Sequence, residues 1–281
     1  MKHYKAIFFD WDGTAVLSRK APVEDAVNAM RPLLDKGVKL CIVSGTTYEN
    51  IAGGKLHSYF TPKQLENLYL GLGRGAFDYG YDATGQPTIL VDRVPDAKGI
   101  LAVHDACYRI HRELSEKYGM NTDIVFSRPN YCKIDLMPAN NRGENLFLQE
   151  GEAARLQHIL QQHGIDSIET VIAMAESFGT PEMPLRATTD AKYLEVGPTG
   201  KSDNVDALFA RFGFAAEDCC FWGDEFIGVT DSIFGSDAGM LTQTTQNGDF
   251  YDVSDLKGVR PEQVKKLGGG IQTFLNFLHE Q

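Results

Sequence analysis

The fold is decided by one stretch near the N-terminus, Ile7-Phe8-Phe9-Asp10-Trp11-Asp12-Gly13-Thr14. A short apolar run of this kind predicts a buried strand, which here delivers two carboxylates into a Gly-Thr turn. Carboxylates held this close repel each other and raise each other's pKa, and a bound divalent cation is the usual compensation. The alternative is a strand followed by an ordinary Asp-Gly turn, which suits many proteins. Residues much farther along the chain distinguish the metal site from the ordinary turn.

Length and composition set the class of protein. The chain has 281 residues, of which 43% are hydrophobic and 23% charged, and its formal net charge is −11. That charge argues against nucleic acid or an anionic membrane surface as the main partner. No apolar run reaches membrane-spanning length, and the first residues show no signal-peptide pattern. We therefore expect a cytoplasmic protein, either a monomer or a homodimer.

The cysteines fit this expectation. There are five, and none forms a CxxC pair: Cys41, Cys107, Cys132, Cys219 and Cys220. Because the number is odd and most of them lie in apolar patterns, the sequence predicts reduced packing residues.

Strand and helix patterns alternate at both ends of the chain. Short buried strands are predicted at 4–9, 38–43, 68–70 and 219–222, with amphipathic helices after several of them. This alternation predicts an α/β fold with a doubly wound, Rossmann-like parallel sheet.

The pattern changes in the middle of the chain. An amphipathic helix that stops at Gly119 is followed by strand patterns at 123–126 and 131–137, and a second helix that ends at Gly164 is followed by strand-like runs at 170–175 and 192–196. A repeated helix-strand-strand order is typical of an α+β module. We therefore predict an inserted cap domain at 93–197 and a core made of 1–92 and 198–281.

Polar groups recur where the core strands end. Besides Asp10 and Asp12 they are Ser44, Lys201 at the start of a helix, and Asp224. In doubly wound sheets ligands bind beyond the carboxyl ends of the strands. A carboxylate nucleophile, a second carboxylate for proton transfer, a hydroxyl, an ammonium and a metal-binding acid are the groups that phosphoryl transfer uses.

These residues, in this order, resemble the four motifs of the haloacid dehalogenase superfamily of phosphohydrolases. The inserted module resembles the cap of its Cof-type branch, subfamily IIB, which is related to phosphomannomutases and sugar-phosphate phosphatases. The resemblance implies Asp10 as the nucleophile and Asp12 as general acid and then base. It also implies Mg²⁺ bound by Asp10, the main-chain carbonyl of Asp12, and Asp224.

Several positions depart from the family pattern. The second motif reads Ser44-Gly45-Thr46 where relatives often have Ser-Gly-Arg, so Arg74 is the expected replacement cation, and Lys201 directly follows Pro198-Thr199-Gly200 while Asp203 holds the more usual lysine position. The stretched fourth motif suggests one more metal-site carboxylate, Asp231, and the cap offers two substrate-binding cations, Arg128 and Arg142.

The sequence therefore predicts a Mg²⁺-dependent phosphatase that hydrolyses a small phosphorylated metabolite, expected to be a sugar phosphate, through an aspartyl phosphate. A sugar phosphomutase like the phosphomannomutases is the alternative enzyme, and a non-catalytic metabolite-binding protein is the alternative class.

Overall fold

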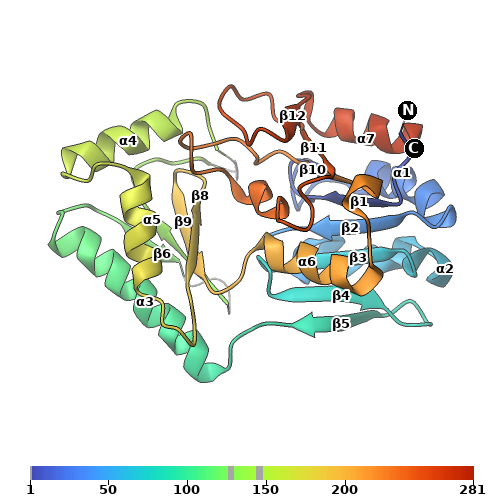
Figure 1. The fold of residues 1–281 in the computed structure, drawn as a ribbon, viewed down its shortest axis with the longest axis horizontal. Coiled ribbons are helices and arrows are strands. Elements are labelled where there is room, and N and C mark those ends of the chain that lie inside the picture. The colour runs from blue at the N-terminus through green and yellow to red at the C-terminus, as the bar shows by residue number, and fades with distance from the viewer. Residues whose placement is uncertain (1, 126–129, 144–147) are drawn as a thin grey trace.

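Two separate sheets organise the chain (Figure 1). The computed structural model describes residues 2–125, 130–143 and 148–281. The strands of the larger, core sheet lie between residues 6 and 92 and between 219 and 266, and those of the smaller, cap sheet lie between 123 and 197. Both termini lie at the end of the core that faces away from the cap (Figure 1).

The core sheet has eight strands in the order β12-β11-β10-β1-β2-β3-β4-β5. All pairs from β12 to β3 are parallel, whereas β3-β4 and β4-β5 are antiparallel. The expected parallel sheet is therefore extended at one edge by two antiparallel strands. The strands are β1 (Ala6–Phe9), β2 (Lys39–Val43), β3 (Leu68–Leu72), β4 (Phe77–Tyr81), β5 (Pro87–Asp92), β10 (Cys219–Gly223), β11 (Asp249–Asp252) and β12 (Val264–Lys266).

Helices cover both faces of this sheet, which explains why its central strands read as continuous apolar runs. Ile7 and Phe9 pack with α1 (Glu24–Asp35) and α7 (Gly270–Glu280) on one face. Phe8 points to the other face and packs with α6 (Lys201–Phe212). The shorter helical segments are α2 (Pro62–Leu65), η1 (Tyr48–Asn50), η2 (Ala52–Gly54), η3 (Leu56–Tyr59), η4 (Ala216–Asp218) and η5 (Ser236–Met240).

The cap contains one antiparallel sheet in the order β6-β7-β9-β8, backed by helices. Its elements are α3 (Ala97–Glu116), β6 (Asp123–Val125), β7 (Cys132–Asp135), α4 (Glu152–Gln162), α5 (Ile168–Ser177), β8 (Arg186–Thr189) and β9 (Tyr193–Gly197). The helices and the sheet share a hydrophobic core of their own, separate from the two cores of the larger sheet.

One predicted cap strand is wrong. Residues 170–175 belong to the helix α5, whose buried side chains are Ile168, Val171, Ile172 and Ala175. Spacings of three and four residues place these four side chains on one face of a helix. Burial of that face outweighs the preference of the β-branched residues for a strand. In the cap, the strand β8 has no counterpart among the strands predicted from the sequence.

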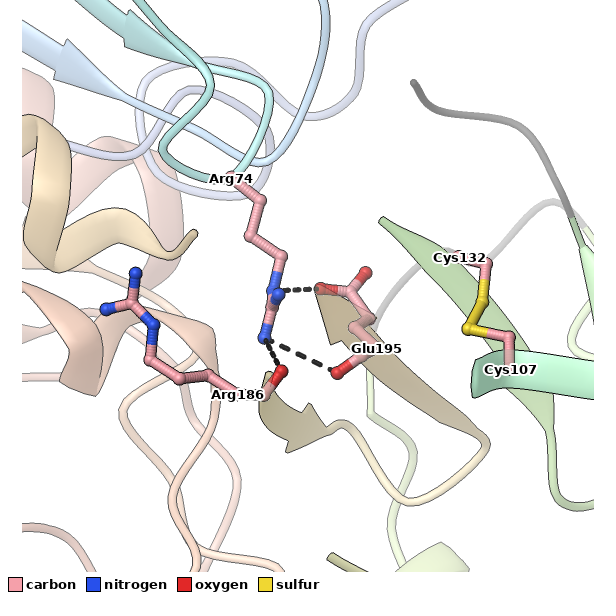
Figure 2. Close-up of a disulfide and its surroundings, with 5 residues drawn as sticks. All are labelled: Arg74, Cys107, Cys132, Arg186 and Glu195. Atoms are coloured by element: carbon pink, nitrogen blue, oxygen red, sulfur yellow. Dashed lines mark hydrogen bonds and ion pairs between the residues drawn. A yellow bond between two sulfur atoms is a disulfide. The ribbon is translucent and has the colours of Figure 1, made fainter. Parts of the chain in front are cut away.

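Two of the cysteines are also not as expected. Cys107 of α3 and Cys132 of β7 form a disulfide within the cap (Figure 2), whereas Cys41, Cys219 and Cys220 are free and buried. The disulfide was not predictable from spacing, because its two cysteines lie 25 residues apart on different elements. No helix among the described residues has the length and apolar character needed to cross a membrane.

Candidate active site

The carboxyl ends of adjacent strands bring the predicted groups together. Asp10 follows β1 and Ser44 follows β2, while Asp224 follows β10, and these three strands are neighbours in the sheet. Lys201 reaches the same edge as the first residue of α6. The groups surround a cavity of about 320 Å³ between core and cap, which is lined by Asp10, Asp12, Arg19, Ser44, Gly45, Thr46, Arg74, Val125, Tyr131, Lys133, Thr188, Thr189, Asp190, Tyr193, Glu195, Lys201, Glu225 and Ser236.

Three carboxylates form a cluster beside this cavity. Oxygen atoms of Asp10, Asp224 and Asp237 all lie within 4.8 Å of one another. Two glycines make the approach possible. A Cβ on Gly13, which has a φ of +84°, would lie 2.2 Å from Asp224 Oδ2, and a Cβ on Gly223 would lie 2.2 Å from Asp237 Oδ2. No other residue type fits these two positions without displacing the cluster.

Lys201 is the cation of the cluster. Its Nζ donates to Asp237 Oδ1 at 2.6 Å and lies 3.4 Å from Asp10 Oδ1. Burial alone would lower the pKa of Lys201, but the Asp10 and Asp237 carboxylates outweigh it, so the pKa is raised and the ammonium stays charged. Asp203, at the family's usual lysine position, instead accepts a hydrogen bond from the Gly200 backbone N–H and caps α6.

One lysine does not neutralise three carboxylates. Burial raises the pKa of Asp10 to about 7 against the pull of Lys201, and burial together with the neighbouring Asp237 raises that of Asp224 well above its usual value. Among the described residues, Asp10 Oδ1 also accepts no hydrogen bond. Buried oxygens with this much uncompensated charge fit a hard divalent cation, which prefers carboxylate ligands. The residues present therefore fit the metal that the sequence predicts.

Asp12 is not one of the three clustered carboxylates, and it lines the cavity. Burial raises its pKa, while Arg19, with Nη2 at 3.5 Å from Asp12 Oδ2, lowers it. Asp12 is thus separate from the three clustered acids and has its own cationic neighbour. The sequence analysis did not single out Arg19.

The second motif contributes small polar groups. Ser44 lies close enough to Asp10 for its hydroxyl to lower the pKa of that carboxyl. Gly45 and Thr46 line the cavity, and the Thr46 hydroxyl accepts a hydrogen bond from Asn50 at 2.9 Å.

The structure brings Asp237, not Asp231, to the acidic cluster. Asp231 is exposed and lines a different surface cavity near α4. Asp237 is fully buried and also accepts a hydrogen bond from the Glu225 backbone N–H at 2.8 Å. The chain between Asp224 and Asp237 loops away from the site and returns, so residue spacing from Asp224 carried no signal for this side chain.

Arg74 lines the cavity as expected, but its guanidinium donates hydrogen bonds that connect the core to the cap. It donates to the carbonyls of Thr199, Arg186 and Glu195, and to the Thr188 hydroxyl. Figure 2 shows it reaching from its core loop to the Glu195 carboxylate and to the Arg186 carbonyl, while the Arg186 side chain points away. In this structure Arg74 links the core to the cap, and its expected role as a phosphate-binding cation stays a prediction.

Of the two predicted cap arginines, Arg142 does not line the cavity. Arg128 lies outside the described residues. Arg142 donates to Glu152 and Asp190 and lines an adjoining cavity of about 400 Å³ instead. The described cap residues that line this cavity with Asp10 are others, among them Lys133, Tyr193 and Glu195.

Comparisons with known proteins bear on the fold. Neither a family model nor a curated protein sequence matches this chain. It is similar in structure to the IMP-bound IMP-nucleotidase of Plasmodium falciparum, with a TM-score of 0.60 and 13% identity over 99% of this chain and 66% of that one. It is also similar to the sucrose-phosphatase of Synechocystis bound to sucrose and phosphate, with a TM-score of 0.58 and 12% identity over 99% and 96% of the two chains. The chain has the fold of these phosphatases. It spans just under two thirds of the length of the nucleotidase chain.

Proposed function

We propose that this protein is a Mg²⁺-dependent phosphatase that hydrolyses a phosphate monoester of a small metabolite, expected to be a sugar phosphate, through an aspartyl phosphate. The observation that carries the proposal is the convergence of Asp10, Asp12, Ser44, Lys201 and Asp224 at one edge of the sheet, under a cap that encloses the cavity. The phosphatases that share the fold support the reaction class.

The first step forms a bond between an Asp10 carboxylate oxygen and the phosphorus atom and breaks the bond from phosphorus to the ester oxygen. The electron pair leaves with that oxygen, which takes a proton from Asp12 and departs as an alcohol. Asp12 suits this role because burial raises its pKa and so favours the protonated form. The Ser44 hydroxyl and the Lys201 ammonium hold the phosphoryl oxygens.

The second step returns the enzyme to its starting state. Water attacks the aspartyl phosphate, Asp12 takes one of its protons, and the bond from phosphorus to Asp10 breaks to release inorganic phosphate. The same carboxyl group therefore serves as acid and then as base.

Asp10 and Asp224 would hold the Mg²⁺, together with the main-chain carbonyl of Asp12, and Asp237 supports the cluster through Lys201. When bound, the ion neutralises charge that builds up between the anionic nucleophile and the phosphate. Hydrolysis of phosphate monoesters is among the slowest uncatalysed reactions, so we expect every part of this arrangement to be needed.

Phosphate release from a panel of metabolite monoesters, with and without Mg²⁺, tests the proposal. Asp10→Asn is the blank, because it keeps the shape of the side chain and removes the nucleophile. Asp231→Asn is the matched control, since Asp231 is an exposed carboxylate outside the cluster. Release that persists in Asp10→Asn would overturn the mechanism, and a panel with no Mg²⁺-dependent release would overturn the function.

The cytoplasmic location and the monomeric or homodimeric state stay predictions from the sequence. The disulfide gives a reason to test the first, because such bonds are rare in reducing compartments. Thiol counting on protein isolated under acid-quenched conditions distinguishes the bonded from the reduced state.

A further inference from the structure

The cap presents very few charges to the catalytic cavity. Its described lining residues include one ammonium, Lys133, and two carboxyl groups, Asp190 and Glu195. The other polar groups on this wall are the hydroxyls of Tyr131, Thr188, Thr189 and Tyr193. A substrate bound to Asp10 in this cavity would place its leaving group near these cap residues, because they line the same cavity as Asp10.

The single ammonium is already neutralised. Lys133 Nζ lies 2.5 Å from Glu195 Oε1. The other carboxylate oxygen of Glu195 lies 3.4 Å from Arg74 Nε (Figure 2). Each carboxylate oxygen therefore faces one cation. Glu195 is thereby fixed in one orientation by the core and by the cap at once.

Glu195 is close to the reacting centre and is ionised. Burial would raise its pKa, but Lys133 and Arg74 lower it more, and the catalytic Lys201 adds to the effect. A fixed carboxylate of this kind accepts hydrogen bonds from hydroxyl groups strongly, since one partner carries a full charge. It repels a second anion placed at the same spot.

Among the residues described, each cation of the adjoining cavity has a carboxylate partner. Lys133 pairs with Glu195, and Arg19 Nη2 lies 3.5 Å from Asp12 Oδ2, although Arg19 Nε has no hydrogen-bond partner. Arg142 forms ion pairs of 2.5 Å with Glu152 and 2.6 Å with Asp190. Lys192 forms one of 2.7 Å with Asp135. A second phosphate on the substrate would have to displace one of these buried pairs, which leaves a carboxylate without a partner at a high cost.

We propose that the leaving group is an uncharged polyhydroxylated molecule and that Glu195, held by Lys133 and Arg74, is the residue that selects it by accepting its hydroxyl hydrogen bonds. The inference rests on the proposed phosphatase function and narrows it. It favours hydrolysis of a monophosphate over a mutase reaction, because a mutase that is activated by a bisphosphate has to accommodate two phosphates.

Two probes that differ in one phosphate group test this: glucose 6-phosphate and glucose 1,6-bisphosphate. In the wild-type protein we expect kcat/KM to favour the monophosphate by about tenfold or more, which corresponds to about 1.4 kcal/mol. Glu195→Gln keeps the shape, removes the negative charge and frees the two cations. It should lower kcat/KM for the monophosphate and shift the ratio toward the bisphosphate by about tenfold.

Lys133→Gln is the opposing variant, because it leaves Glu195 with less compensation and should strengthen rejection of the bisphosphate. Glu116→Gln, which changes an exposed cap carboxylate on α3, should leave the ratio unchanged. Circular dichroism and thermal unfolding identify any variant that fails to fold. The proposal is overturned if the wild-type protein prefers the bisphosphate or does not discriminate, or if a folded Glu195→Gln protein loses both activities with the ratio fixed.

The failure of the underlying function is visible separately. If neither probe releases phosphate, the phosphatase proposal falls. Titration calorimetry then measures the affinity of each probe for the inactive Asp10→Asn protein in the presence of Mg²⁺. A tighter binding of the monophosphate, lost when Glu195 is also replaced by Gln, would still show that Glu195 discriminates between the two probes.

Discussion

Replacing Asp10 by Asn removes one negative charge from the acidic cluster and leaves the shape of the side chain unchanged. Activity should be lost, since the nucleophile is gone. We also expect the metal-free protein to become more stable, because Asp10 is buried with Asp224 and Asp237 within 4.8 Å and Lys201 is the one cation paired with them among the described residues. A residue required for catalysis would then be one that weakens the folded state.

The size of the effect follows from the pKa. Burial raises the pKa of Asp10 from 3.8 to about 7, which corresponds to about 4 kcal/mol at 1.36 kcal/mol for each pH unit. The folded protein therefore holds this proton more tightly than the unfolded chain does. The stabilising contribution is complete below about pH 3.8 and is lost as the pH rises through about 7. Asn does not titrate, so the advantage of Asp10→Asn should grow between these two pH values and then level off.

Urea unfolding in EDTA at pH 5, 6, 7 and 8 measures this advantage. At pH 8 we expect Asp10→Asn to exceed the wild-type protein by about 2 to 4 kcal/mol, with the upper value set by the full pKa change. Mg²⁺ at a hundred times its Kd should stabilise the wild-type protein by about 2.7 kcal/mol and narrow the gap. Asp231→Asn should show neither effect. An Asp10→Asn protein no more stable than the wild type at pH 8 in EDTA would refute the account of a strained, uncompensated cluster.

Three other changes have expected outcomes. Removing the cross-link by Cys107→Ala with Cys132→Ala should lower the free energy of unfolding by about 3.5 kcal/mol, given the 25-residue separation; equal urea midpoints with and without the bond would argue against this. Lys201→Met leaves Asp237 buried without a cation, so EDTA unfolding should show a loss of about 3 to 5 kcal/mol together with lost phosphate release. Arg74→Lys keeps the charge but not the planar set of donors, and kcat/KM should fall about tenfold to a hundredfold as the cap shifts. Unchanged kinetics would show that the cap does not depend on Arg74 for its position.

Much of the core could be predicted because its signals are local. The apolar run before Asp10 is buried on both faces, and that alone requires helices on both sides of a parallel sheet. The strands β4 and β5 were missed because they lack the apolar run that marks a central strand: burial alternates along β4, and no residue of β5 is fully buried. The run at 170–175 misled because β-branched residues lie on one buried face of α5, where packing outweighs strand propensity.

Most of the proposed catalytic residues were predictable for a related reason. Asp10, Ser44 and Asp224 each follow a recognisable buried strand, and the topology then fixes their meeting point. Asp237 follows no strand and reaches the cluster from a loop and a short helix, so only the folded chain reveals it. Glu195 carries no motif either, because its position depends on the pairing of β9 with β7, which sets it beside Lys133.

The two walls of the cavity differ in their charge balance, and the difference suits the chemistry. The core wall holds more buried carboxylate than Lys201 can neutralise, as the raised pKa of Asp10 and of Asp224 shows, and so it favours a divalent cation. The cap wall pairs Lys133 with a carboxylate and keeps it from binding a phosphate by itself. A free cation on the cap would attract the phosphoryl group away from Asp10, because the phosphate is the most highly charged part of the substrate. The pairing of Lys133 on the described part of the cap wall therefore favours binding of the phosphate at the core and leaves the hydroxyl-bearing part of the substrate for Glu195.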